Sequence, residues 1–224
     1  MAAELSKGKG RIFLVDDHPL VREWLTNLIN QQPDLVVCGE AESGPEAMKG
    51  ILNLKPEVAI VDIALKDSSG IELIKSLKQC CPMVAVLVLS MHEEAHYAER
   101  AMRAGAKGYI MKRDTSRKVI SAIRQVLEGK MYISEEIAAL MAAQYIHGKT
   151  LTTQSPLELL SDRELEVFEL LGQGRGTRQI AQTLRVSVKT VQAYCARIKE
   201  KLNLASATEL LREAVRWHEG VHKT

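Results

Sequence analysis

The sequence lacks the features of a membrane or secreted protein. It has no run of about 18 consecutive apolar residues, the length at which a transmembrane helix is inferred. Its first residues, MAAELSKGKGR, lack the apolar middle of a secretory signal peptide. The 224 residues are 46% hydrophobic and 26% charged, as in ordinary globular proteins and unlike disordered ones. We therefore expect a globular protein in the cytoplasm, with no membrane partner.

Cysteine is also scarce, and its spacing predicts no disulfide framework or metal site. The four cysteines, Cys38, Cys80, Cys81 and Cys195, form no C-x-x-C pair, and the adjacent Cys80 and Cys81 are poorly placed to bond each other. Reduced thiols agree with a cytoplasmic location. Internal repeats and low-complexity tracts are absent from the sequence, which excludes solenoid architectures.

Short apolar runs alternate with helical patterns over the first 130 residues. The runs are rich in β-branched residues, and 58–65 and 83–90 are almost continuously apolar, as expected for parallel strands covered on both faces. Ser43 and Glu46 open the second helical pattern with the spacing of a capping box. Five βα units in series predict an α/β fold, a flavodoxin-like doubly wound (βα)5 parallel sheet. The expected strands are 11–17, 35–41, 58–65, 83–90 and 108–112.

After residue 130 the pattern changes to helix alone. A helix is expected over 134–148, followed by the polar, turn-rich KTLTTQSP, so 131–156 is interpreted as a linker. Beyond it, Ser161 and Glu164 form a capping-box pattern, and four helices are expected at 161–172, 177–184, 188–202 and 206–219. The prediction is a first domain at 10–130 and a small all-α four-helix domain at 157–220.

Polar residues stand at the carboxyl ends of the expected strands, where ligands bind in open α/β sheets. Asp16 and Asp17 end the first strand, Asp62 lies in the third, Ser90 ends the fourth and Lys112 the fifth. Three carboxylates brought together repel one another unless a divalent cation lies among them, and oxygen ligands favour Mg²⁺. A lysine and a hydroxyl beside them can hold phosphoryl oxygens. One carboxylate then remains to attack phosphorus and form an acyl phosphate.

The motifs LVDDHPLVRE (14–23), VDIALKDSSGIEL (61–73), VLSMHEE (88–94) and AGAKGYIMKRD (104–114) resemble the receiver domain of two-component response regulators. The resemblance implies a role for each matching position. Asp62 is the phosphoacceptor; Asp16, Asp17, Asp62 and the backbone carbonyl of Ala64 bind Mg²⁺; Lys112 pairs with the phosphoryl group; Ser90 is the switch hydroxyl; and Tyr109 is the coupled aromatic residue that follows it inward. The sequence departs from the family at Lys66 and Arg113, where proline is common.

Two alternatives concern enzymes. An aspartate nucleophile with Mg²⁺ is also found in phosphatases, so the pocket alone does not exclude an acyl-phosphate phosphatase. His92 and His96 fit the H-E-x-x-H pattern of zinc hydrolases, but the other histidines stand in unrelated contexts and offer no evident third ligand. We interpret this match as accidental. His92, two residues after Ser90, either controls water at the phosphoryl group or is a plain surface histidine.

Residues 177–202 have the pattern of a helix-turn-helix, with one short helix, a tight turn and a longer basic helix. Residues 187–202 carry four basic side chains against Glu200 alone. Val191, Cys195, Ile198 and Leu202 are spaced to form a buried stripe. A small helical bundle with a basic face is the alternative reading.

The opposite face of the longer helix offers groups suited to DNA. Basic and hydroxyl side chains contact phosphates, Gln pairs with adenine, Arg pairs with guanine or a phosphate, and Ala allows close approach to a thymine methyl. The expected DNA-contacting residues are Arg178, Lys189, Thr190, Gln192, Ala193, Tyr194, Ala196 and Arg197.

The segments LSDRELEVFELLGQG (160–174) and IAQTLRVSVKTVQAYCARIKEKLNLASATEL (180–210) resemble the LuxR/NarL-type output domain. Tyr194 replaces the histidine usual in that family, and Ala196 stands where several members have lysine, so the DNA target is not transferable. Receiver plus output domain is the layout of NarL/FixJ-type response regulators. It implies a sensor histidine kinase and double-stranded DNA as partners, a homodimer through the last helix when phosphorylated or DNA-bound, and no small-molecule turnover.

Overall fold

A computed structural model describes residues 8–65, 69–91, 94–114, 116–135, 138–139, 159–184 and 186–221. The chain divides into two compact units, 1–147 and 148–224. Among the residues that the structure describes, none of the helices combines the length and hydropathy needed to cross a lipid bilayer.

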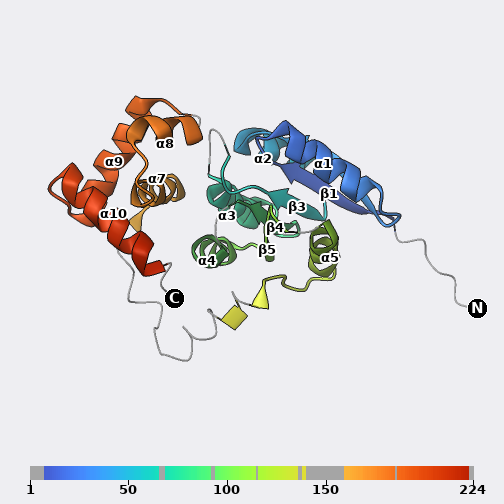
Figure 1. Ribbon diagram of the computed structural model, residues 1–224. Coiled ribbons are helices and arrows are strands. Elements are labelled where there is room, and N and C mark those ends of the chain that lie inside the picture. The colour runs from blue at the N-terminus through green and yellow to red at the C-terminus, as the bar shows by residue number, and fades with distance from the viewer. Residues whose placement is uncertain are drawn as a thin grey trace, which may run out of the picture. The chain divides into compact units, whose positions relative to one another are not determined.

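The first unit is built on a five-stranded parallel sheet in the order β2-β1-β3-β4-β5 (Figure 1). Its register pairs Val15 with Val61 and Val61 with Val88, so the carboxyl ends of the central strands are level. This confirms the predicted doubly wound sheet. The strands are β1 (Gly10–Val15), β2 (Leu35–Ala41), β3 (Val58–Val61), β4 (Ala85–Ser90) and β5 (Gly108–Met111).

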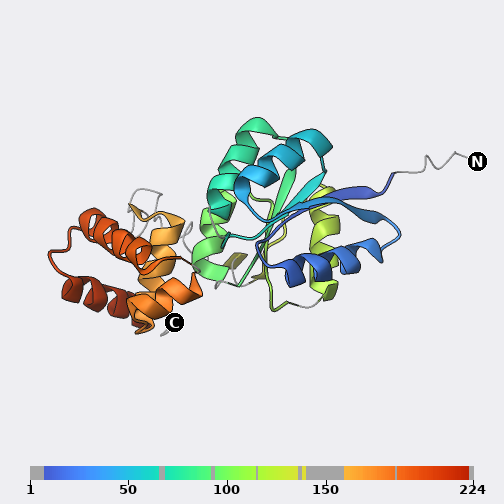
Figure 2. The same ribbon diagram turned by 90° about the horizontal axis from the view of Figure 1, so that it is seen from above.

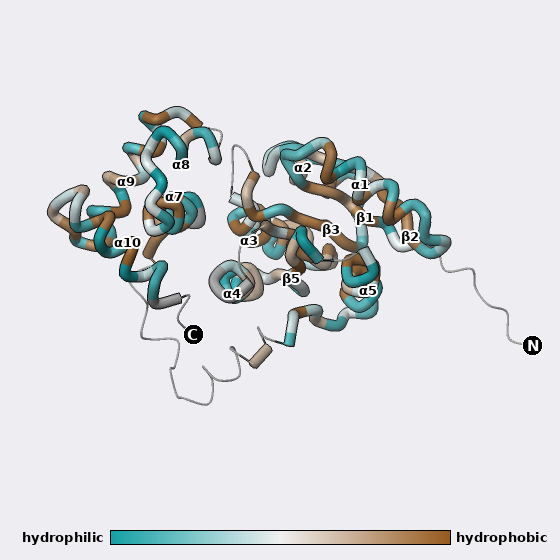
Figure 3. The backbone as a smooth tube through the Cα atoms, in the orientation of Figure 1, coloured by the Kyte–Doolittle hydropathy of each residue, from teal (hydrophilic) through white to brown (hydrophobic). Residues whose placement is uncertain are grey.

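Helices cover both faces of the sheet (Figure 2). On one face lie α1 (Pro19–Asn30) and α5 (Ser116–Leu127); on the other lie α2 (Gly44–Leu54), α3 (Gly70–Cys80) and α4 (Glu94–Ala104). Alternate strand residues such as Ile12, Leu14 and Ile60 are fully or almost fully buried against α1 and α5. The strands are correspondingly hydrophobic between the more polar helices (Figure 3). Coverage of both faces explains why the strand sequences are continuously apolar.

The two expected capping boxes differ in outcome. At the start of α2, Ser43 is the N-cap but its side chain makes no capping hydrogen bond, so that half of the prediction is wrong. Glu46 still accepts a hydrogen bond from the Glu42 backbone N–H at 3.0 Å. At the start of the second unit, Ser161 and Glu164 form both bonds of the box, at 3.4 and 2.7 Å.

The chain after α5 returns to the sheet beside β5. The Tyr109 N–H donates to the Tyr132 carbonyl, and the Tyr132 N–H to the Lys107 carbonyl, both at 2.9 Å. Most of the helix expected over 134–148 lies outside the described residues.

The second unit contains α7 (Asp162–Gly172), α8 (Thr177–Thr183), α9 (Val188–Leu202) and α10 (Ala207–Val221). Its core includes Phe168, Ile180, Val191 and Ile198, none of which has exposed surface. The ring of Phe168 lies 5.9 Å from that of Trp217, which joins α7 to α10. The four predicted helices are confirmed: α9 has the predicted ends, and the ends of the other three differ by at most two residues.

Candidate functional site

The acidic residues predicted to meet at the strand ends do meet. Asp16 follows β1 and Asp62 follows β3, and they are only 2% and 3% exposed. One ligand atom from each of Asp16, Asp17, His18 and Asp62 lies within 4.8 Å of the others. The sheet register explains this meeting, because β1 and β3 are neighbours that end level with each other.

Lys112, directly after β5, links the two buried carboxylates. Its Nζ lies 2.6 Å from Asp16 Oδ2 and 2.7 Å from Asp62 Oδ2, and its side chain is 8% exposed. The Lys112 N–H donates to the carbonyl of Ser90, the last residue of β4, at 2.7 Å. One cation is thus shared between two carboxylates that would otherwise repel each other.

The backbone holds Asp62 in place. Its N–H donates to the Val15 carbonyl at 2.8 Å, and its Oδ1 accepts from the Ala64 N–H at 3.3 Å. The first residue of α3, Gly70, passes so close that a Cβ there would lie 2.2 Å from the Asp62 carbonyl oxygen. Gly70 was not identified from the sequence, because the close approach joins segments whose spacing reveals nothing about it.

Burial and charge act in opposite directions on this pocket. Burial raises the pKa of Asp62, and the neighbouring Asp16 raises it further, while Lys112 lowers it; the net direction is upward. Burial lowers the pKa of Lys112, but the two carboxylates raise it more strongly, so the ammonium stays charged. Burial therefore makes the ionised form of Asp62 unfavourable, and Lys112 only partly offsets this effect.

His18 is the pocket residue that sequence reasoning missed. Its Nδ1 lies 2.8 Å from Asp17 Oδ1 and 3.1 Å from Asp16 Oδ1, and its side chain is 42% exposed. From the sequence, this histidine was expected to stand in a context unrelated to metal binding. The available sign was its position directly after two acidic residues at a strand end.

The other predicted pocket residues have varied placements. Ser90 and Tyr109 are fully buried, so Tyr109 already has the inward position that was expected to follow phosphorylation. Ala64 contributes the N–H described above, and nothing in the structure tests its carbonyl as a ligand. His92, Glu93 and the side chain of His96, which make up the H-E-x-x-H match, lie outside the described residues.

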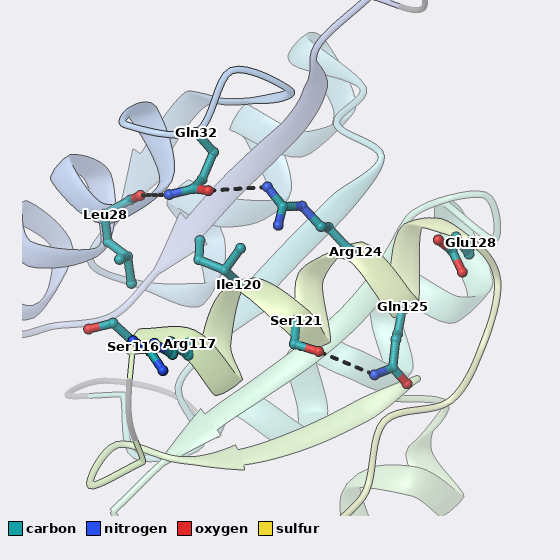
Figure 4. Close-up of a pocket in the computed structure, with 9 residues that line it drawn as sticks. All are labelled: Leu28, Gln32, Ser116, Arg117, Ile120, Ser121, Arg124, Gln125 and Glu128. Atoms are coloured by element: carbon teal, nitrogen blue, oxygen red, sulfur yellow. Dashed lines mark hydrogen bonds between the residues drawn. The ribbon is translucent and has the colours of Figure 1, made fainter.

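A separate hollow lies between α1 and α5 (Figure 4). It has a volume of about 480 Å³ and is lined by residues of those two helices, including Leu28, Ile120 and Arg124. Arg124 donates to Gln32 at 3.1 Å and pairs with Asp34 at 2.8 Å. None of the acidic pocket residues lines this hollow.

In the second unit, α8, a tight turn and α9 form the predicted helix-turn-helix. The Ser187 side chain caps α9 by accepting from the Thr190 N–H at 3.0 Å, and the two hydroxyls lie 2.8 Å apart. Thr190 is therefore tied into the start of the helix. The Val186 N–H donates to the Ala181 carbonyl at 3.0 Å, which closes the turn.

Most of the expected DNA-contacting side chains lie on the surface of this helix pair. The Arg197 guanidinium lies over the Tyr194 ring, 5.9 Å from its centroid, which restricts both side chains. Thr190 and Tyr194 are half-buried. The exposed residues are Arg178, Lys189, Gln192, Ala193, Ala196 and Arg197.

The inner face of α9 is less buried than its spacing predicted. Val191 and Ile198 have no exposed surface, whereas Cys195 and Leu202 are only half-buried. Burial raises the pKa of the Cys195 thiol, and Lys199 lowers it by less. Apolar spacing identifies the face that turns inward but does not give the depth of each residue.

Comparison with known families agrees with both sites. The family described as "Response regulator receiver domain" matches residues 12–128. The family described as "Bacterial regulatory proteins, luxR family" matches residues 158–214. The first match covers the acidic pocket, and the second covers the helix-turn-helix.

Relatives are similar over nearly the whole chain. The oxygen regulatory protein NreC of Staphylococcus haemolyticus (strain JCSC1435) is 33% identical over 210 residues, which are 92% of this chain and 97% of that protein. A LuxR-family two-component response regulator from Aurantimonas sp. SI85-9A1 is 32% identical, with a TM-score of 0.58, over 62% of this chain and 99% of that one. The Salmonella typhimurium response regulator RcsB, at 24% identity and a TM-score of 0.56 over 92% of this chain and 98% of that one, shares the fold. The chain belongs to the response regulators that join a receiver domain to a LuxR-type DNA-binding domain and regulate transcription.

Proposed function

We propose that Asp62 is the phosphoacceptor of this response regulator and that a sensor histidine kinase is the donor. The observation that carries the proposal is the buried Asp62 carboxylate, held 2.7 Å from Lys112 Nζ at the carboxyl edge of the sheet. A raised pKa and a charged partner held close by are typical of carboxylates in functional sites.

The transfer is a displacement at phosphorus. A carboxylate oxygen of Asp62 forms a bond to the phosphorus of a phosphohistidine, the P–N bond breaks, and its electron pair returns to the imidazole of the kinase. Lys112 stabilises the negative charge that develops on the phosphoryl oxygens. The Ala64 N–H, 3.3 Å from Asp62 Oδ1, helps to orient the nucleophile.

The donor atoms present suit a Mg²⁺ ion. Asp16, Asp17 and Asp62 offer carboxylate oxygens within 4.8 Å of one another, which is the oxygen-rich environment that a hard cation prefers. When bound, the ion supplies charge neutralisation for the carboxylates and for the incoming phosphoryl group. We infer that Asp16 and Asp17 hold it, with the Ala64 carbonyl as a further ligand.

Phosphorylation is proposed to act through Lys112 and Ser90. The backbone bond between them connects the ends of β4 and β5, so a shift of Lys112 toward a phosphoryl group moves both strand ends. The fully buried Tyr109 lies in the same strand, β5. Changes at this surface then bias homodimerisation and DNA affinity.

The helix pair α8–α9 is proposed to read double-stranded DNA with α9 in the major groove. We infer that the exposed Lys189 and Arg178 contact phosphates and that Gln192 contacts adenine. Arg197, which lies over the Tyr194 ring, is inferred to contact guanine or a phosphate. Replacing Gln192 with alanine should change base preference at one position. Replacing Lys189 with alanine should weaken binding to every sequence and reduce its salt dependence.

The experiment that tests the assignment uses acetyl phosphate and Mg²⁺ on the full chain. The natural protein should acquire a phosphoryl group that is lost in both acid and base, as acyl phosphates are, and should bind duplex DNA more tightly. Asp62→Asn should acquire none, while Asp114→Asn, a change in the nearby β5–α5 turn, should behave like the natural protein. Equal labelling of the Asp62→Asn protein contradicts the assignment.

A further inference from the structure

Hydrogen bonds hold the backbone of His18 beside the acidic pocket, and its ring nitrogen Nδ1 contacts Asp16 Oδ1. His18 is the N-cap of α1 and has an extended conformation, which Pro19 after it favours. Its N–H donates to Asp16 Oδ1 at 2.8 Å, and its carbonyl accepts from the N–H groups of Val21 and Arg22 at 3.1 and 3.2 Å. The residue is thus held from both sides, and its side chain is placed over the acidic pocket.

The Nδ1 atom of His18 is spaced from the carboxylates like one ligand of a shared cation. It lies 2.8 Å from Asp17 Oδ1 and 3.1 Å from Asp16 Oδ1. Two ligands at right angles on an octahedral cation, each at about 2.1 Å, are roughly 3 Å apart. The ring nitrogen that now faces the carboxylates therefore occupies a position from which it can bind a cation together with them.

We propose that His18 is a nitrogen ligand of the cation site formed by Asp16, Asp17 and Asp62. This rests on the cation site of the proposed function. Nitrogen ligation favours Co²⁺ and Zn²⁺ over Mg²⁺, because imidazole suits the later transition metals and Mg²⁺ prefers oxygen. The pocket thus gains affinity for transition-metal ions that three carboxylates alone would not provide.

Manganese is the probe that tests the proposal. Pulsed electron paramagnetic resonance of Mn²⁺ bound to the full chain should show the coupling of a directly bonded ¹⁴N nucleus. His18→Asn keeps an N-cap residue but offers oxygen in place of imidazole, so this coupling should disappear. Calorimetric titration should show Co²⁺ affinity falling at least about tenfold in His18→Asn, while Mg²⁺ affinity changes much less.

Two further variants separate the possible outcomes. His218→Asn, in α10 of the second unit, should leave both affinities and the coupling unchanged. Asp17→Asn should weaken both ions. If Mn²⁺ binds without ¹⁴N coupling and Co²⁺ binds equally well to His18→Asn, His18 only donates a hydrogen bond, and this inference is overturned while the cation site stands. If Asp17→Asn binds both ions as well as the natural protein does, the cation site of the proposed function fails, and this inference with it.

Discussion

Replacing Lys112 with methionine removes the cation shared by Asp16 and Asp62 while keeping a long side chain. Each contact, at 2.6 and 2.7 Å, corresponds to about 6 kcal/mol of Coulomb attraction at an effective dielectric constant of about 20. Most of this attraction offsets the desolvation of three buried charges. Removing one partner alone leaves the carboxylates uncompensated, which typically costs about 3–5 kcal/mol. We expect Lys112→Met to lower the free energy of unfolding of the first unit by that amount at neutral pH without divalent cations.

Urea denaturation of the full chain measures this loss. The sequence has two tryptophans, Trp24 in α1 and Trp217 in α10, so Trp217→Phe in every sample leaves Trp24 to report the first unit. Lys118→Met is the matched control, because Lys118 also pairs with an aspartate at 2.9 Å but is 58% exposed. Exposed pairs contribute little, so the control should lose less than about 1 kcal/mol.

Two conditions should reduce the loss in Lys112→Met. Mg²⁺ should bind the variant more tightly than the natural protein, because Asp16 and Asp62 have lost the ammonium that competes with it. At about 100 times the variant's dissociation constant, Mg²⁺ should add about 2.7 kcal/mol to the stability of the variant and less to that of the natural protein. Lowering the pH should also reduce the difference from the natural protein, since removing Lys112 raises the pKa of Asp62 further and a protonated carboxyl needs no counterion. A loss no larger than that of the Lys118 control, or one insensitive to both Mg²⁺ and pH, would refute the reasoning.

Three more predictions concern Asp62, Glu164 and Gly70. Since the pKa of Asp62 is raised in the folded state, its ionisation opposes folding as pH rises above its ordinary pKa of 3.8. Asp62→Asn should therefore be about 1 kcal/mol more stable than the natural protein at pH 7, and urea denaturation should show this gain vanishing below pH 3.8. Burial alone would raise the pKa of Glu164, but its bonds from Lys201 and Ser161 lower it. Lys201→Met should therefore lower the free energy of unfolding of the second unit by about 1–2 kcal/mol, a loss that shrinks as pH falls through 4.5. Trp217 fluorescence in a Trp24→Phe background measures this loss. Gly70→Ala should lower the free energy of unfolding by about 2 kcal/mol or more and slow acetyl-phosphate labelling, because its Cβ would lie 2.2 Å from the Asp62 carbonyl oxygen. Gly129→Ala, which has open space around it, is the comparison for labelling.

Much of the first unit could be predicted from the sequence because its strands are marked by local sequence patterns. Continuous apolar runs identified the buried parallel strands. Because ligand-binding residues gather at the carboxyl ends of such strands, Asp16, Asp62 and Lys112 were expected to meet, as they do. Gly70 could not be found this way, because its contact depends on how α3 approaches the end of β3. His18 was visible in the sequence, but the direction of its ring depends on hydrogen bonds that spacing does not reveal.

The placement of Lys112 suggests how charge at Asp62 reaches the rest of the sheet. Lysine has three N–H donors, and two of them now serve Asp16 and Asp62. Phosphorylation turns one Asp62 oxygen into the bridging oxygen of an acyl phosphate, which is a poorer acceptor, and adds phosphoryl oxygens that are better acceptors. Lys112 therefore gains by moving toward the phosphoryl group, and its backbone N–H pulls on the Ser90 carbonyl through their 2.7 Å bond. In Lys112→Met, Asp62 should consequently still be labelled, although more slowly, but labelling should no longer increase DNA affinity. If labelled Lys112→Met protein binds DNA as tightly as the labelled natural protein does, the response does not depend on Lys112.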